Sequence, residues 1–293
     1  METNSIKTTI NMLGPIAWIA LAAGLQILGA LLFFRAPIDL ILVFTGASIT
    51  FSVYLLNRFT DDEDSYNCPE QKILFQRKPA LISIPISLFA ISFLILAFSG
   101  RLVAWHIVLL ICGIFYSVSF IPILKRKSIS FIRIKDIFFI KNILVSFLWG
   151  ITPFILAGSF RHSMPPRSDF IVVVFAFCLT ALINSTSCDV RDMVGDRLAG
   201  IVTFANYFGK KFTAFCLCFF GVAGCLAVGI NHYAGHVSVP ATLFFFITVL
   251  WSGIVASPIY LRTLQLPKSV SEPLNDSQVV FNGISLIVLS MCV

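Results

Sequence analysis

Three aspartates follow a long apolar run in the stretch NSTSCDVRDMVGDR, which begins at residue 184 of this 293-residue chain. Asp189, Asp192 and Asp196 are spaced by three and then four residues, so they share one face if the helix of the apolar run continues through them. Carboxylates at the edge of an apolar segment are costly to retain, and acidic residues in such places are candidates for chemistry.

A second acidic group, YLLNRFTDDEDSYNCPE at residues 54–70, follows an earlier apolar run. Asn57, Asp61 and Asp64 are spaced by four and then three residues, again one helical face. If both apolar runs cross a membrane and end on the same side of it, the two acidic faces would repel each other without cations between them. Oxygen-only ligands suit Mg²⁺, which phosphate oxygens usually complete. We therefore predict that both groups, six residues in all, are catalytic and bind Mg²⁺ as the cofactor. The plainer interpretation, solvated acids at helix ends, accounts poorly for two such faces among Arg and Lys.

Four basic residues are candidates for binding the diphosphate that such a site would attract: Lys141, Arg77, Lys78 and Arg191. Lys141 lies in IFFIKNILVSFLWG, close to the start of an apolar run, where an ammonium is expensive unless it is paired. The competing interpretation is that Lys141 extends to the membrane interface.

The elements that must position these residues are apolar helices. Mean hydropathy is +0.93, only 12% of residues are charged, and 30 are Phe. About 20 apolar residues suffice to cross a bilayer. The sequence predicts an all-α polytopic membrane protein, a single domain over residues 1–293, with nine spans at 13–34, 38–57, 80–100, 102–124, 137–158, 168–188, 212–231, 238–262 and 277–293.

The basic residues also predict orientation. With nine spans, 16 of the 21 Lys and Arg residues fall on the side that carries both acidic groups, and four fall on the other. The positive-inside rule then places the active site toward the cytoplasm. Topology and attraction to anionic lipid explain the net charge of +7, so membrane lipid is expected as a partner and nucleic acid is not.

On these motifs the sequence resembles the UbiA superfamily of intramembrane prenyltransferases. DVRDMVGDRLAGIVTFANYFG is similar to the family's D-x-x-D-x-x-x-D motif and the Gly, Thr and Gly that follow it. The first motif of the family is N-D-x-x-D-x-x-x-D. Here Asn57 and Asp61 align with it, Arg58 replaces an aspartate, and Ser65 stands at the last position. Which of Asp62, Glu63 and Asp64 completes the first metal site stays open, although helical spacing favours Asp64.

The resemblance implies a nine-helix bundle of UbiA type that ionises an allylic isoprenyl diphosphate. YSVSFIPILK and IKNILVSFLWGITP look like the family's stretch with a Tyr and a diphosphate-binding Lys. Tyr54 and Tyr116 are the residues we expect to shield the allylic cation, because aromatic faces attract cations. The prenyl group would pass to an aromatic or lipid-like acceptor. The alternative is a membrane terpene cyclase on the same scaffold, in which the chain's own double bonds capture the cation. A transporter is disfavoured because the acids lie at span ends.

Overall fold

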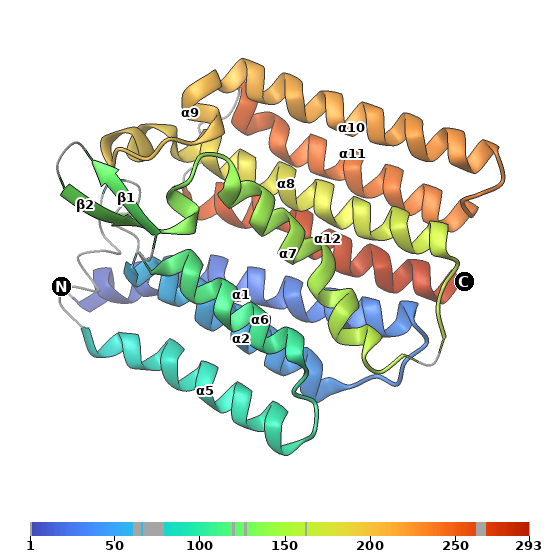
Figure 1. Cartoon of the computed structure of the whole chain (residues 1–293), viewed down its shortest axis with the longest axis horizontal. Helices are drawn as coiled ribbons and strands as arrows, with labels where there is room; N and C mark the ends of the chain where they lie inside the picture. Colours follow the sequence, from blue (N-terminus) through green and yellow to red (C-terminus); the bar gives the residue numbers. More distant parts are fainter. Residues whose placement is uncertain are drawn as a thin grey trace.

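The computed structural model describes residues 2–60, 66, 79–118, 121–125, 128–161, 163–261 and 268–292. Long α-helices dominate it and lie side by side as a bundle (Figure 1). The longer helices are α1 (Glu2–Phe33), α2 (Leu40–Thr60), α5 (Ser83–Phe98), α6 (Ala104–Ser117), α7 (Ile140–Gly158), α8 (Arg167–Leu198), α10 (Lys210–Tyr233), α11 (Val239–Leu261) and α12 (Lys268–Cys292). Shorter elements are the 3-10 helices η1 (Pro79–Ile82) and η2 (Ile134–Asp136), and α9 (Phe204–Phe208).

Each predicted span overlaps one of the longer helices, and in the described part of the chain seven of these helices are long and apolar enough to cross a membrane. At 14 residues α6 is shorter than a full crossing, and α12 is not among the seven. Large apolar side chains such as Phe98 and Phe215 are exposed on the outside, as lipid contact requires. The chain is an integral multi-pass membrane protein, and the count of nine crossings stays a prediction.

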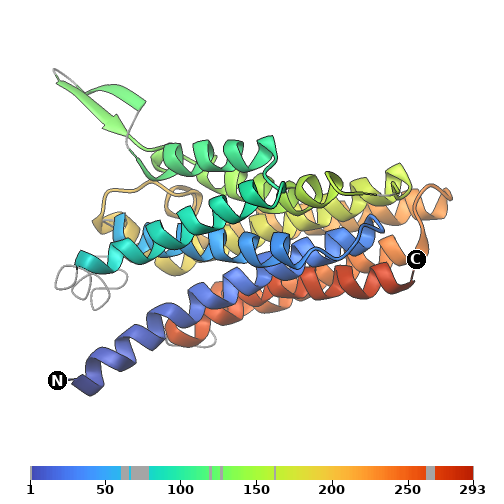
Figure 2. The same cartoon turned by 90° about the horizontal axis from the view of Figure 1, so that it is seen from below.

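One predicted span is wrong at its end. The apolar run 102–124 was expected to form one helix, but α6 ends at Ser117 and residues Ile121–Lys125 form strand β1. β1 pairs antiparallel with β2 (Ser128–Ile132), and the hairpin projects beyond the helices in Figure 2. Pro122 and the β-branched isoleucines of both strands disfavour a helix, although their hydropathy resembles that of a span.

The bundle has two chemically different ends. The C-terminal ends of α2 and α8, together with α9 and the β-hairpin, gather at one end, which we call the charged end (Figure 1). At the opposite end an ion pair joins Arg101 and Asp39, and the Asp169 carboxylate accepts a hydrogen bond of 2.9 Å from the backbone N–H of Ser238. Helix α8 spans the whole distance, so it carries the second acidic motif at one end and Asp169 at the other.

The apolar core lies where α1, α7, α8, α11 and α12 pack, around Phe34, Phe154 and Phe177. α12 approaches α1 closely because Gly283 faces it: a Cβ at this position would lie 2.8 Å from the Leu25 Cβ. Small residues at such crossings let membrane helices pack backbone to backbone. The α1–α12 contact therefore fixes the position of α12 in the bundle.

Candidate active site

Asp189 is the most deeply buried member of the second acidic motif, with 1% of its surface exposed. Lys141 Nζ, from the first turn of α7, lies 2.8 Å from Asp189 Oδ1. The adjacent Asn142 donates from Nδ2 to Asp189 Oδ2 at 2.9 Å. Both carboxylate oxygens thus have a donor, and each keeps a further lone pair for another ligand. The Lys141 ammonium, which would be costly in an apolar segment without a partner, is therefore paired.

Asp192 is held differently, by a neighbour on its own helix. The Arg191 guanidinium binds it through two hydrogen bonds, Nη2 to Oδ2 at 2.8 Å and Nε to Oδ1 at 3.1 Å. The same Nη2 lies 3.6 Å from Oε1 of Glu272 in α12. Glu272 Oε1 also accepts a hydrogen bond of 3.1 Å from Nη2 of Arg58, at the end of α2. One buried carboxylate of α12 therefore contacts both acidic motifs.

A buried line of hydrogen bonds, which we call the polar seam, continues from this cluster between α8 and α12. Asn184 donates to the backbone carbonyl of Asn275 at 2.9 Å, and Asn275 donates back to that of Asn184 at 3.2 Å. Deeper in the bundle, Asn282 donates to the Thr180 hydroxyl. Polar contacts between membrane helices stabilise their association where the hydrophobic effect cannot. The seam thus fastens α12 along α8.

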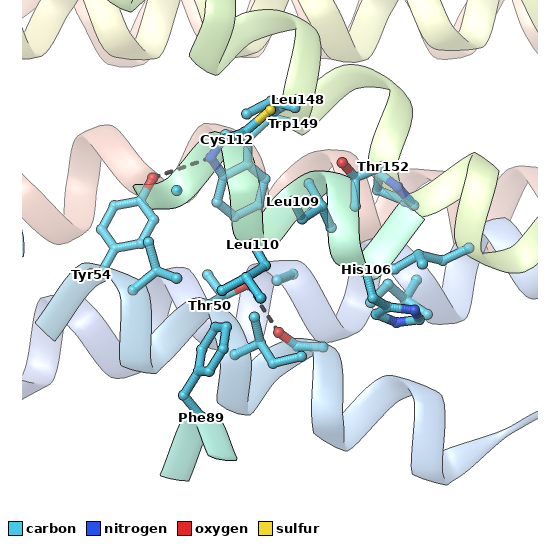
Figure 3. Close-up of a pocket in the computed structure, with 18 of the residues that line it drawn as sticks. Thr50, Tyr54, Phe89, His106, Leu109, Leu110, Cys112, Leu148, Trp149 and Thr152 are labelled. Atoms are coloured by element: carbon cyan, nitrogen blue, oxygen red, sulfur yellow. Dashed lines mark hydrogen bonds between the residues drawn. The ribbon is translucent and has the colours of Figure 1, made fainter. Parts of the chain in front are cut away.

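We call Lys141, Asp189, Arg191, Asp192 and Glu272 the charged cluster. An apolar cavity of about 240 Å³ lies near it. Its walls come from α1, α2, α5, α6 and α7 (Figure 3). Asn57 and Tyr116 line it near the charged end, and Val145 lies one turn beyond Lys141. The lining of α6 reaches back to His106, ten residues from Tyr116 and so about 15 Å away along the helix. The cavity is therefore long, and we call its end at Asn57 and Tyr116, about one helical turn from the paired Lys141, its mouth.

Aromatic side chains line this cavity on several sides: Tyr54, Phe89, Phe93, Tyr116 and Trp149. Trp149 Nε1 donates to the Tyr54 hydroxyl at 3.1 Å across the space between α7 and α2 (Figure 3). Lys135 is buried with its Nζ 5.7 Å from the centre of the Tyr116 ring, a cation–π distance. Aromatic rings thus face the mouth of the cavity from α2, α6 and α7.

The segment between the hairpin and α7 is fixed by a local ion pair. Arg133 Nη2 lies 2.8 Å from Asp136 Oδ1, and the Arg133 backbone N–H donates to Asp136 Oδ2 at 3.0 Å. Burial raises the pKa of Asp136, but the hydrogen bonds and charge of Arg133 outweigh it and hold this pKa below its ordinary value. The carboxylate stays ionised and anchors the turn that leads to Lys141.

The structure brings several predicted residues together. Asp189 meets Lys141 and Asp192 meets Arg191, while Asn57, Tyr54 and Tyr116 share the cavity wall. Asp196 is buried at the end of α8. The predicted residues Asp61, Asp64, Arg77 and Lys78 lie outside the described residues.

Among the described residues, no group of three or more His, Cys, Asp or Glu side chains is arranged to hold a metal ion. The available donors nevertheless suit Mg²⁺, because they are carboxylate and amide oxygens. Asp189 and Asp192 each already lie against a cationic side chain, so these carboxylates sit where positive charge is needed.

Two residues of the site were missed from the sequence. Asn142 follows Lys141 directly, and a polar pair at the start of an apolar run was a usable signal. Glu272 lies 214 residues from Arg58, at the start of a helix that the sequence predicted only from residue 277. Only tertiary contact identifies Glu272.

Fold and site together define a polytopic helical membrane protein with a paired charged cluster at the mouth of a long aromatic-lined cavity. Residues 12–270 match the family described as the UbiA prenyltransferase family. The chain belongs to this family. No curated protein sequence matches it.

Solved structures share the fold. A UbiA homologue from Archaeoglobus fulgidus, bound to GPP and Mg²⁺, superposes with a TM-score of 0.64 at 16% identity, over 96% of this chain and 99% of that one. An apo UbiA homologue from Aeropyrum pernix K1 gives 0.58 at 16% identity, over 92% and 97%. A structure of digeranylgeranylglyceryl phosphate synthase gives 0.56 at 16% identity, over the full length of both.

Proposed function

We propose that this protein ionises an allylic isoprenyl diphosphate with Mg²⁺ and transfers the prenyl group to an aromatic or lipid-like acceptor inside the membrane. The observation that carries the proposal is the pairing of Lys141 with Asp189 at the mouth of the apolar cavity. The diphosphate headgroup would lie at the charged residues, and the hydrocarbon chain would lie in the apolar cavity. The family and the Archaeoglobus homologue bound to GPP and Mg²⁺ support this substrate class.

The charged cluster would hold the diphosphate. Lys141 supplies an ammonium beside Asp189, and Asn142 keeps that carboxylate oriented. Asp189, Asp192, Asp196 and Asn57, with Asp61 and Asp64, are the residues we propose as metal ligands. Bound Mg²⁺ supplies Lewis-acid neutralisation of the departing diphosphate. Fixed positive groups around a departing anion give most of the acceleration in such reactions.

The cavity would take the isoprenyl chain. Its wall is apolar over most of its length, and the rings of Tyr54, Tyr116 and Trp149 are near the mouth, where the first carbon of the chain would lie. Aromatic faces stabilise an allylic cation without attacking it as a strong nucleophile would. Burial also keeps bulk water away from the cation. These residues hold and shield the reacting group.

A terpene cyclase is the second candidate function, and the aromatic lining favours it. Five aromatic side chains surround the cavity, among them Phe93, whose ring centre lies 6.4 Å from that of His106. Such a lining could shield a cation that moves along its own chain. In either case the basic residues of the charged end support an orientation with this end toward the cytoplasm.

Product analysis tests the proposal. Protein in lipid nanodiscs is incubated with Mg²⁺ and geranyl, farnesyl or geranylgeranyl diphosphate, with and without a panel of phenolic and lipid acceptors. Mass spectrometry then identifies the products. Acceptor-dependent prenylated products support the transferase, whereas a cyclic hydrocarbon or terpene alcohol formed without acceptor supports the cyclase.

The matched variants are Asp189→Asn and Asp169→Asn, two buried acids at opposite ends of α8. Asp189→Asn should abolish turnover and Asp169→Asn should retain it. Excess EDTA should stop turnover, and added Mg²⁺ should restore it. Full activity of Asp189→Asn, or turnover that persists in EDTA, contradicts the proposed mechanism.

A further inference from the structure

A single nitrogen of Arg191 is shared by two carboxylates. Its Nη2 is 2.8 Å from Asp192 Oδ2 and 3.6 Å from Glu272 Oε1. The side chains of Arg191 and Glu272 are only 16% and 6% exposed, so their charges are mostly removed from water. A shift of less than 1 Å would transfer the nitrogen from one carboxylate to the other.

This sharing matters because a metal ion at Asp192 would draw on the carboxylate charge that now pairs with Arg191. Both of its oxygens accept hydrogen bonds from the guanidinium. The metal ion that accompanies a bound diphosphate would compete with the guanidinium for the same oxygens. Removing one close partner from a buried guanidinium is strongly destabilising, so a second anion must be within reach of Arg191 before Asp192 can turn away from it.

Glu272 is placed to be that anion. It enters from α12, a helix outside both acidic motifs, and the polar seam fastens that helix to α8. Arg58, which replaces an aspartate of the family's first motif, holds the Glu272 carboxylate at 3.1 Å. The altered first motif thus provides a cation that keeps an acid next to the second motif.

We propose that Glu272 is a positioning residue that pairs with Arg191 when Asp192 binds the metal ion of a metal–diphosphate complex. The proposal rests on the proposed function. In the resting arrangement Arg191 neutralises Asp192; in the loaded arrangement Glu272 takes the guanidinium and Asp192 takes the metal. No covalent bond changes, and the net charge of the three side chains stays the same.

Direct metal binding tests this inference without turnover. Protein in nanodiscs is titrated with Mn²⁺ in the presence of inorganic diphosphate, and bound Mn²⁺ is followed by electron paramagnetic resonance. Glu272→Gln should weaken Mn²⁺ binding by about ten- to a hundredfold, as loss of a residue that orients a ligand does. Glu272→Asp should recover part of the affinity.

The decisive measurement is a double-mutant cycle with Arg191→Gln. If Glu272 acts by accepting Arg191, its loss should have no further effect on Mn²⁺ affinity once the guanidinium is gone. Asp276→Asn is the charge control, because this acid lies one turn further along α12 and accepts its hydrogen bond from Asn184 instead. It should change Mn²⁺ affinity less than threefold.

Three results would overturn the inference. An unchanged Mn²⁺ affinity in Glu272→Gln, with a lowered thermal stability, would make Glu272 a helix clamp only. An equal loss of affinity with and without Arg191 would mean that Glu272 acts independently of it. If the unaltered protein binds no Mn²⁺ with diphosphate, the proposed function falls and the inference with it.

Discussion

The ammonium of Lys141 lies 2.8 Å from the buried Asp189 carboxylate, although the two residues are 48 positions apart and belong to different helices. The pairing explains why a cation is retained in the first turn of an apolar helix. It also puts a positive charge at the mouth of the cavity, where a diphosphate would arrive.

Replacing Lys141 with Met should lower turnover of an isoprenyl diphosphate by about 10²–10³-fold, because one fixed positive group around the leaving group is lost. Lys141→Arg should retain more activity than Lys141→Met. Diphosphate release in nanodiscs measures the effect. Arg101→Gln removes an ion pair at the opposite end and should leave the rate within a few-fold of the unaltered protein. Equal losses in Lys141→Met and Arg101→Gln would contradict a specific role for Lys141.

Restoring the family's aspartate at position 58 should harm this protein. Arg58→Asp would place a carboxylate beside the buried Glu272 where a guanidinium now donates to it. We expect a loss of roughly 2–3 kcal/mol of unfolding free energy, somewhat less than for a fully buried pair because Arg58 is partly exposed. Adding Glu272→Gln should recover most of it, as measured by thermal unfolding. A stable Arg58→Asp single variant would show that the pair contributes little.

Narrowing the cavity should change chain-length preference. Gly113 lines the cavity one turn from Tyr116, and a Cβ there would meet no other atom within 4 Å. Gly113→Leu should therefore fold normally and reduce use of geranylgeranyl diphosphate relative to geranyl diphosphate by about tenfold or more, since the added side chain occupies the path. Gly253→Leu is the control, because it is equally uncrowded but lines a separate hollow between α10 and α11. The same change in chain-length preference in both variants would contradict the placement of the isoprenyl chain in this cavity.

Crowding the α1–α12 crossing should destabilise the bundle. A Cβ at Gly283 would lie 2.9 Å from the backbone carbon of Leu25, so Gly283→Ala forces two helices apart at a cost of about 1–3 kcal/mol. Gly229→Ala should be tolerated, since its nearest neighbour would be a Phe246 ring carbon at 3.8 Å. Thermal unfolding of both variants in the same nanodiscs gives the comparison, and equal midpoints would show that α12 can shift to accommodate the methyl group.

Most of the helical architecture could be predicted from the sequence, because hydropathy reports which segments lie in lipid. The sixth span was predicted only to residue 188, whereas α8 runs to Leu198, so the condition under which Asp189, Asp192 and Asp196 share a helical face is met. Hydropathy cannot distinguish an apolar strand from the end of a span, and residues 121–124, which belong to β1, were therefore assigned to a span. It also missed the first turns of α12, where polar residues such as Glu272 face protein instead of lipid.

The candidate site was predictable in composition but not in pairing. Spacing grouped Asp189 with Asp192, yet only the fold shows that each has a different cationic partner. The family resemblance identified Arg58 as a departure and gave no reason for it. The structure shows that Arg58 pairs with Glu272, which comes from the far end of the chain and has no local signature. The roles of the individual site residues stay predictions.

The polar seam also sets the axial register of α12. Thr180, Asn184 and Arg191 on α8 meet Asn282, Asn275 and Glu272 on α12 in reverse order, as antiparallel helices require. A slide of one turn, about 5.4 Å, would break every one of these contacts at once. These contacts therefore fix the position of α12 along the axis of α8. A change at Asn282, deep in the bundle, should shift Glu272 at the charged end.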